Sequence, residues 1–401
     1  MKVKPAERAG SVQEYYFSSK LRQIDEMRKA GIDVINLGIG SPDQPPSENT
    51  VRRLANEAAK PNVHGYQSYS GSPVLRKAFA DWYRKYFNVV LDPATEIMPL
   101  IGSKEGIMHI SMAFVDPGDE ILVPDPGYPT YSSATRLAGG IVKPYDLNET
   151  GKWLPDIAKL EDSDLSRVRL MWINYPHMPS GAKANIRIFE KLVGFAMKHN
   201  ILLCNDNPYS FILNNDHLSL LSVDGAREIS IELNSLSKSH NMAGWRIGMA
   251  ASNGEFISTV LRVKSNMDSG IFLPLQLAAA EALGNDGEWY LKVNRVYSER
   301  RIAAGEIFSV LGCTWDPGQS GMFLWGRLPE SYGSCEEFSD NLLHSSAVFI
   351  TPGFIFGNNG KRYIRISLCS SAELLIEAKQ RIEEFRNKKD NNTINRFNST
   401  L

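Results

Sequence analysis

The sequence predicts an α/β protein: a large domain with a mainly parallel central sheet flanked by helices, and a smaller α+β domain. Two features of the sequence support this prediction. As far as residue 290, apolar strand-like runs alternate with helix-like segments, which is typical of a parallel sheet with crossover helices. Beyond it, one long helical pattern leads into several short strands and a last helix. We therefore expect a large domain at 46–290, a small domain formed by 1–45 and 291–390, and a disordered tail at 391–401.

Five apolar runs are expected to form the buried strands of the large domain, and each ends in a turn that is polar or contains glycine. They lie at 96–102, 120–125, 168–174, 201–206 and 229–237. In the small domain we expect a long helix at 285–312, strands at 320–329, 347–353 and 362–369, and a final helix at 371–389. Ligands of open α/β sheets bind at the carboxyl ends of the strands, so the turns after the five runs form the candidate site.

Composition and charge favour a protein that acts on small molecules. The 401 residues contain 44 Lys and Arg against 45 Asp and Glu, so neither nucleic acid nor an anionic membrane is an expected partner. The four cysteines lack the short paired spacing of metal sites and disulfide frameworks. The first ten residues lack the apolar segment of a signal peptide, and no run of about 18 apolar residues occurs. We expect a cytoplasmic protein that holds no metal ion.

The stretch NSLSKSHNMAGWRIGM (234–249) places Lys238 directly after a predicted buried strand. A lysine ammonium is costly there unless an anion or a covalent partner offsets its charge. Desolvation also lowers the pKa of a lysine, which makes the amine a nucleophile able to form an imine. On the same loop Ser235 offers a hydroxyl and Arg246 a guanidinium, and arginine binds phosphate in bidentate fashion.

A second turn carries an anion-binding pattern. Gly102, Ser103 and Lys104 stand between a predicted strand and an apolar-periodic helix, where free backbone N–H groups favour an anion such as phosphate. Taken alone, this turn also fits an ordinary helix cap.

Two further turns carry groups suited to a flat, nitrogen-containing ring. Tyr128 lies in the proline-stiffened stretch VPDPGYPTYSS, where a rigid aromatic can stack on such a ring or simply pack in the core. Asp206 ends the run 201–206 and is followed by Tyr209. A buried carboxylate needs a cationic partner such as a protonated ring nitrogen, the structural alternative being a turn cap. A phosphate cradle, a ring stacker, a ring-nitrogen anion and an imine-forming lysine together describe a site for pyridoxal 5'-phosphate.

These turns resemble those of the class I/II aminotransferases of fold type I, from INLGIGSPDQPP (35–46) to RYIRISLC (362–369). The most specific match is SLSKSHNMAGWRIG (235–248), which resembles the lysine signature of the family. The resemblance implies that Lys238 holds pyridoxal phosphate as an internal aldimine, that Asp206 pairs with the pyridine nitrogen and that Tyr209 donates to the ring oxygen. It implies stacking by Tyr128, and further cofactor contacts by Gly102, Ser103, Lys104, Asn174, Ser235, Ser237 and Arg246.

The same resemblance implies a substrate pocket and a partner subunit. Arg365 in YIRISL matches the arginine that binds the substrate α-carboxylate, and Ile39 and Gly40 match residues of the same pocket. Tyr66 matches a tyrosine that reaches the phosphate of the neighbouring subunit in a homodimer. The implied reaction moves an amino group between an L-amino acid and a 2-oxo acid.

The sequence departs from the family pattern at NYPHMPSG (174–181), where Met178 stands in place of an asparagine that donates to the ring oxygen. A thioether cannot donate, and His177 is a candidate replacement. The same site could serve another fold-type I enzyme, a C–S lyase or an eliminase. A non-catalytic regulator that binds pyridoxal phosphate is a third possibility, although the segment before residue 40 has neither the length nor the basic face of a DNA-binding unit.

The amino donor is not identified by the sequence. The stretch KSNMDSGIF (264–272) is similar to the subgroup that contains alanine and LL-diaminopimelate aminotransferases. Arg262 is a candidate, and no more than that, for binding a distal carboxylate of the substrate.

Overall fold

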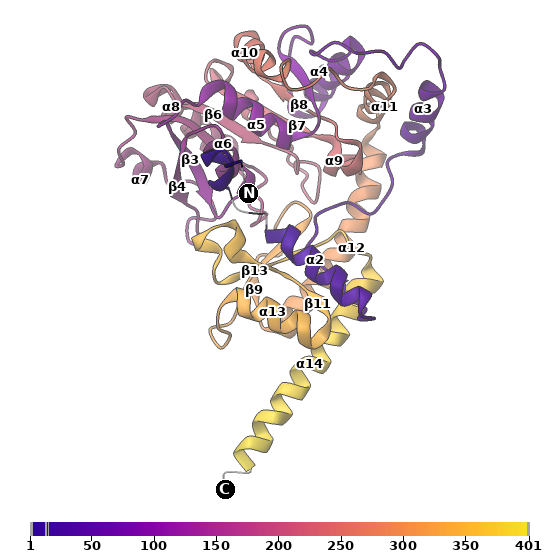
Figure 1. The fold of residues 1–401 in the computed structure, drawn as a ribbon, viewed down its shortest axis with the longest axis vertical. Coiled ribbons are helices and arrows are strands. Elements are labelled where there is room, and N and C mark those ends of the chain that lie inside the picture. Colours follow the sequence, from indigo (N-terminus) through magenta and orange to yellow (C-terminus); the bar gives the residue numbers. More distant parts are fainter. Residues whose placement is uncertain (1–2, 13, 15, 399–401) are drawn as a thin grey trace.

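The computed structural model describes residues 3–12, 14 and 16–398. Its largest sheet has seven strands and forms the centre of the upper part of the molecule in Figure 1. The spatial order is β2 (Ile97–Leu100), β8 (Gly248–Ala251), β7 (Ser230–Ser235), β6 (Leu202–Asp206), β5 (Val168–Ile173), β3 (Glu120–Asp125) and β4 (Ile141–Asp146). The five strands from β4 to β7 are parallel, and β8 runs antiparallel to both of its neighbours. The mainly parallel sheet predicted from the sequence is confirmed.

Helices cover both faces of this sheet, because its strands are apolar on both sides. In β5, Leu170 and Trp172 face one core, and Met171 and Ile173 face the other. The first core is closed by α5 (Ser103–Phe114), α6 (Pro129–Leu137) and α10 (Gly254–Lys264), and the second by α7 (Ile157–Glu161) and α8 (Ile186–His199). A third cluster joins α4 (Pro73–Phe87) and α11 (Leu273–Leu283) to the β2 and β8 edge, with α3 (Glu48–Ala58) against α11.

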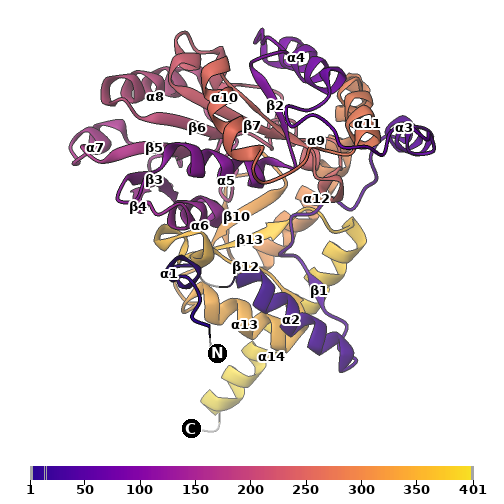
Figure 2. The same cartoon turned by 45° about the horizontal axis from the view of Figure 1, so that its top comes forward.

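The remaining segments form a smaller α+β part, seen below the sheet in Figure 2. Its four-stranded sheet has the order β12 (Thr351–Pro352), β13 (Tyr363–Ser367), β10 (Phe323–Arg327) and β9 (Thr314–Trp315), and β1 (Ile35–Asn36) pairs with β11 (Val348–Phe349). Its helices are α2 (Tyr16–Lys29), α13 (Cys335–Ser346) and α14 (Ala372–Asn398), whereas α1 (Glu7–Gly10) lies against α6 of the larger part (Figure 1). The seven-stranded sheet lies within 46–290, and the strands of the other two sheets lie outside it. The domain boundaries expected near 46 and 290 stay a prediction.

The long helix α12 (Gly287–Leu311) connects the two parts, as the pattern at 285–312 predicts. Both ends of α12 are capped. At the N-terminus the Asp286 carboxylate accepts the N–H of Trp289 at 3.3 Å, and at the C-terminus Gly312 ends the helix with a φ of 69°.

Two segments differ from the expectations. The edge strand β4 was not expected, because most of its residues are exposed or half-buried and Pro144 interrupts its apolar pattern. The helix α14 continues to Asn398 and so enters the segment 391–401, for which we expected disorder; residues 399–401 lie outside the described part. Leu375, Ala378 and Ile382 anchor the first turns of α14 in the core, and a helix nucleated in this way gains one hydrogen bond for each residue added.

Candidate active site

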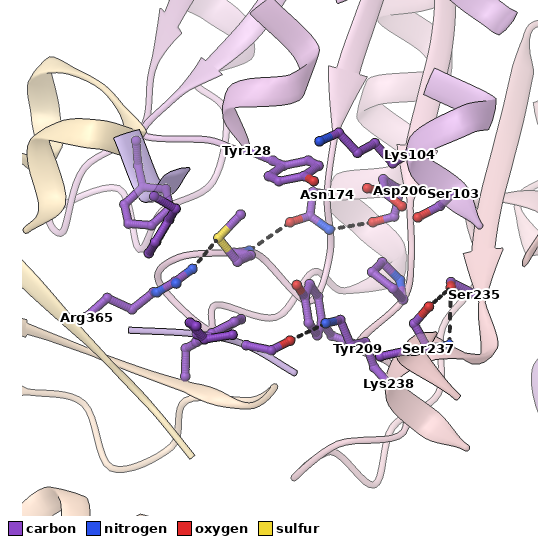
Figure 3. Close-up of a pocket in the computed structure, with 18 of the residues that line it drawn as sticks. Ser103, Lys104, Tyr128, Asn174, Asp206, Tyr209, Ser235, Ser237, Lys238 and Arg365 are labelled. Atoms are coloured by element: carbon purple, nitrogen blue, oxygen red, sulfur yellow. Dashed lines mark hydrogen bonds between the residues drawn. The ribbon is translucent and has the colours of Figure 1, made fainter. Parts of the chain in front are cut away.

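The carboxyl ends of the parallel strands border a cavity of about 520 Å³ that also receives residues of the smaller part. In Figure 3, Lys238, Asp206 and Arg365 converge on it from three different elements. Gly102 and Tyr66 are predicted site residues that lie outside its lining. The predicted residues in the lining are Ile39, Gly40, Ser103, Lys104, Tyr128, Asn174, Asp206, Tyr209, Ser235, Ser237, Lys238, Arg246 and Arg365.

Lys238 enters the cavity from α9 (Leu236–Ser239), a short helix that begins where β7 ends. Ser235 caps this helix, because its hydroxyl accepts the N–H of Ser237 at 3.2 Å. The Lys238 ammonium donates to the carbonyl of Gly40, which belongs to the N-terminal segment. Burial lowers the pKa of Lys238, so more of its amine is deprotonated and nucleophilic at neutral pH than in water.

Asp206 ends β6 at the bottom of the cavity with only 4% of its surface exposed. The Tyr131 hydroxyl donates to its Oδ2 at 3.0 Å, whereas Oδ1 is buried and has no hydrogen-bond partner among the described residues. Burial raises the pKa of Asp206 to about 6, and the hydrogen bond from Tyr131 and the nearby Ser103 hydroxyl oppose that rise. The arrangement therefore presents a buried carboxylate oxygen that lacks the donor such a group requires.

The wall next to Asp206 is built around the N-terminus of α5, where Gly102 provides no side-chain cap. Arg246 crosses this turn: its Nη2 donates to the carbonyl of Ile101 at 3.1 Å and its Nη1 to the Ser237 hydroxyl at 3.3 Å. Gly102 has a φ of +84°, and a Cβ at this position would lie 2.1 Å from Arg246 Nη2. Gly102 is thus outside the lining but gives Arg246 its place. Free helix N–H groups, two hydroxyls and a guanidinium make this wall a site for a phosphate dianion.

Two tyrosines border the space between Asp206 and Arg365. Tyr128 precedes α6, and its ring meets that of Tyr131 edge-on with 5.6 Å between centroids. The Tyr209 ring meets that of Phe323 edge-on at 6.0 Å. Burial raises the pKa of Tyr128 and of Tyr209, so both hydroxyls stay protonated and can donate.

Asn174 lines the cavity, but its amide is engaged by the backbone. Its Nδ2 donates to the carbonyl of Asp206, and its Oδ1 accepts the N–H of Met178 at 2.8 Å. Asn174 therefore holds two neighbouring segments in place, as the dashed lines of Figure 3 show.

His177 does not take over the donor role that Met178 cannot perform. Its Nδ1 lies 2.7 Å from the Ser180 hydroxyl and its Nε2 lies 3.1 Å from the carbonyl of Pro126. Burial lowers the pKa of His177 to about 3, so the ring is neutral, and it lies outside the cavity lining. The replacement of a donor by His177 that the sequence suggested is wrong, because both ring nitrogens already have partners in the turn.

Arg365 projects from β13 with 4% of its surface exposed. Its Nη2 donates to the carbonyl of Gly38 at 2.8 Å, and its Nη1 lies 3.3 Å from the Met178 sulfur, which is a weak acceptor. The centroid of the Phe323 ring is 3.8 Å from the guanidinium carbon, and the ring of Phe356 is 4.7 Å away. The guanidinium is thus oriented by two aromatic rings and by the backbone of Gly38, with the Met178 sulfur beside its Nη1.

Comparison with known proteins is decisive at this point. Residues 32–382 match the family described as aminotransferase class I and II. An LL-diaminopimelate aminotransferase from Dehalococcoides mccartyi is 42% identical over 91% of this chain and 95% of its own length, and one from Moorella thermoacetica is 40% identical over 96% and 99%. The chain belongs to the class I and II aminotransferases. Among solved structures, substrate-bound BacF from Bacillus subtilis superposes with a TM-score of 0.90 at 34% identity, covering 96% of this aminotransferase and 98% of BacF.

Aminotransferases of this family depend on pyridoxal 5'-phosphate, and two observations on this chain fit that cofactor. A protonated pyridine nitrogen would give Asp206 Oδ1 the donor it lacks. The uncapped N-terminus of α5, with Arg246 across it, matches the charge and the acceptors of the phosphate group. Asp206 and Arg246 both line the cavity that Lys238 enters, so one ligand can reach both features.

Several lining residues of this aminotransferase were not predicted from its sequence, and among them are Phe17, Leu21, Phe323 and Phe356. Phe17 and Leu21 stand four residues apart on α2, and this spacing was the available signal that both face the same side of a helix. Phe323 and Phe356 lie in short apolar segments whose pattern is that of an ordinary core.

Tyr66 has 93% of its surface exposed and lies outside the cavity of its own chain. A role at the neighbouring subunit's site is consistent with that position and stays a prediction.

One group of side chains elsewhere has the chemistry of metal ligands: Glu105, His109 and Asp268, with ligand atoms within 4.8 Å of one another. The Lys264 ammonium lies 2.7 Å from Asp268 Oδ2 and supplies a positive charge there. The expectation that the protein holds no metal ion stays a prediction. Within the described segments, no helix combines the length and apolar composition needed to cross a membrane.

Proposed function

We propose that this aminotransferase transfers the amino group of an L-amino acid to a 2-oxo acid in the Lys238 cavity, with Lys238 as the amine that carries the cofactor. The observation that supports this most is the placing of three groups around one space. Lys238 has a lowered pKa, Asp206 Oδ1 lacks a partner among the described residues, and Arg365 lies in the cavity wall with its guanidinium 3.8 Å from the centroid of the Phe323 ring. An amine, a ring anion and a carboxylate clamp are what amino-group transfer requires.

Asp206 and Tyr209 are assigned to the cofactor ring. The bound cofactor supplies an electron sink that makes the α-proton of the substrate acidic. Because the pKa of Asp206 is about 6, the group is mostly ionised at neutral pH and can keep a ring nitrogen protonated. Tyr209, whose hydroxyl stays protonated, would donate to the ring oxygen of a bound cofactor, and Tyr128 would pack against the ring face.

Lys238 and Arg365 are assigned to the substrate. Arg365 binds the α-carboxylate through its Nη1 edge, where a carboxylate oxygen is a far better acceptor than the sulfur of Met178. With the carboxylate held there, the Lys238 amine would act as the general base that removes the α-proton and as the general acid that gives the proton back. Gly40 allows Phe323 to approach this part of the cavity wall, since a Cβ at that position would lie 2.2 Å from the Phe323 ring.

The experiment that tests this proposal is chemical. The protein loaded with pyridoxal phosphate is treated with borohydride, digested, and analysed by mass spectrometry for the lysine that carries the reduced cofactor. We expect the label on Lys238 and conversion of an amino acid to its 2-oxo acid without release of ammonia. A label on another lysine would overturn the assignment of Lys238. Release of ammonia or of a thiol would favour an eliminase or a C–S lyase.

We further propose a homodimer in which Tyr66 contacts the phosphate end of the neighbouring site. The support is an exposed apolar surface around Tyr66 that a monomer would leave in water. Tyr69 is 45% exposed, Met267 60% and Phe272 42%, and Phe272 stacks on His64 near Tyr66 in the chain. A cytoplasmic location is supported by the four cysteines, which are all free and buried.

A further inference from the structure

We propose that the cavity selects an amino acid with a large apolar side chain rather than one with a second charged end, an inference that rests on the proposed function. The relatives named LL-diaminopimelate aminotransferases act, by their name, on a donor with a distal ammonium and carboxylate. The wall that this chain builds around Arg365 has a different chemistry.

The cavity wall beside Arg365 is apolar. It is formed by Phe17, Leu21, Ile39, Met178, Phe323 and Phe356. Phe17, Phe323 and Phe356 surround the guanidinium, with ring centroids at 5.6, 3.8 and 4.7 Å from its central carbon. A substrate held by its α-carboxylate on Arg365 therefore has aromatic and aliphatic surface next to its side chain.

Apart from Arg365, the charged side chains of the lining lie at the cofactor end or at the reacting centre. Arg246 is hydrogen-bonded to Ile101 and Ser237, and Lys238 to Gly40. Figure 3 places Lys104 beyond Tyr128 as seen from Arg365, beside Ser103 on the first turn of α5. A distal carboxylate or ammonium next to Phe17 and Phe356 would lose water without gaining a partner from the described residues of this chain, which is costly.

The two outer members of this wall, Phe17 and Leu21, come from α2. This helix is anchored on the smaller part by Ile24, which is fully buried against Val34 and Phe349. Phe17 and Leu21 are themselves only partly buried, so they can be replaced without opening a core. Ser18 lies on the exposed side of the same helix and offers a matched control position.

The first test compares donors on the holoenzyme with one common 2-oxo acid acceptor. We expect kcat/KM for phenylalanine to exceed that for aspartate and for LL-diaminopimelate by roughly 100-fold, because a pocket without a partner rejects a charge strongly. Binding of unreactive acids gives an independent measurement: 3-phenylpropanoate should bind more tightly than glutarate in calorimetry. Faster turnover of the charged donors, or tighter binding of glutarate, would overturn the inference.

The second test moves a charge into the wall. Leu21→Lys should lower kcat/KM for phenylalanine and raise it for aspartate, changing their ratio by about 10-fold or more. Ser18→Lys adds the same charge to the solvent side of α2 and should leave the ratio unchanged. Equal effects of the two substitutions would show that Leu21 does not contact the substrate side chain and would overturn its assignment. Transfer with charged donors alone would refute this inference and leave the proposed function standing, whereas no transfer with any donor would refute both.

Discussion

The buried carboxylate of Asp206 should make the cofactor-free protein less stable at neutral pH than at acid pH. Its pKa is about 6 in the folded protein against an ordinary value of 3.8, a rise caused mainly by burial. A raised acid pKa means that the folded state holds the proton more tightly, so this group destabilises the fold progressively as pH rises from about 4 to about 6. The difference of about 2 pKa units corresponds to about 3 kcal/mol of unfolding free energy at pH 7.

Asp206→Asn removes the charge and keeps an oxygen that can accept from Tyr131, so it isolates this effect. We expect the cofactor-free variant to be more stable than the wild type at pH 7.5 by up to about 3 kcal/mol, and the advantage to vanish near pH 4. Denaturant unfolding of both proteins across this pH range measures the difference. With pyridoxal phosphate bound the order should reverse, because Asp206 then has a cationic partner that asparagine cannot satisfy equally.

Two results would refute this reasoning. A stability difference that does not change with pH would mean that Asp206 does not titrate between 4 and 6. A cofactor-free Asp206→Asn protein that is less stable than the wild type at pH 7.5 would mean that Oδ1 has a donor in solution. In the second case the orphaned oxygen would no longer support the cofactor fit.

Substitutions at four positions test the other assignments. Lys238→Ala should still bind the cofactor but lose the borohydride-reducible link and lower turnover by several orders of magnitude, which absorbance and kinetics measure. Arg365→Ala should lower kcat/KM for the amino donor, with a loss of about 2–5 kcal/mol in transition-state stabilisation and an intact cofactor spectrum, and Arg365→Lys should restore kcat/KM only in part. Loss of the cofactor in Arg365→Ala would indicate a structural role. Mixing inactive Lys238→Ala and Tyr66→Ala chains should restore part of the activity if sites are shared, and a fully active monomer in sedimentation would exclude sharing. Met178→Asn should lower the pH midpoint of the visible cofactor band relative to Met178→Leu, since only the amide donates to the ring oxygen; equal midpoints would contradict this.

The sequence predicts those parts of the fold and site whose residue types carry a physical demand. A buried charge, such as that of a lysine after one strand or a carboxylate at the end of another, is costly unless a partner lies nearby. A glycine before a helix permits a backbone conformation that other residues rarely adopt. The strands that end at Asp206 and Ser235 were placed correctly because short, nearly continuous apolar runs are typical of parallel strands that are buried on both faces.

The residues that escaped prediction carry no such demand. Phe17 and Leu21 are ordinary apolar residues of an amphipathic helix, and only the packing of α2 brings them to the cavity. His177 suggested a donor by its type, yet its partners Ser180 and the Pro126 carbonyl are fixed by the path of the turn. The residue type alone does not indicate which hydrogen-bond partners a side chain has in the folded protein.

The contacts that join the two parts explain why the site is specific in shape as well as in chemistry. Asp125, at the end of β3, accepts the N–H of Asn358 at 3.0 Å and that of Asn359 at 2.9 Å, from the short 3-10 helix η5 (Asn358–Gly360). The N–H of Gly127 donates to the carbonyl of Phe356 at 2.8 Å. These bonds tie the turn that presents Tyr128 to the loop that presents Phe356.

On the other side of the cavity, Arg300 of α12 holds Asp43 through two hydrogen bonds of 2.7 Å, close in the chain to Ile39 and Gly40. The groups assigned to the cofactor and the apolar wall assigned to the substrate are therefore fixed relative to one another by residues that contact neither. A substitution that loosens one of these ties, such as Asp125→Ala, should raise KM for the donor more than it weakens cofactor binding, because Lys238, Asp206 and Ser103 all belong to the larger part while Arg365 and Phe356 belong to the smaller. Steady-state kinetics together with cofactor titration would separate the two effects. Equal losses in both would show that the ties hold the cofactor pocket itself rather than the distance between the two parts.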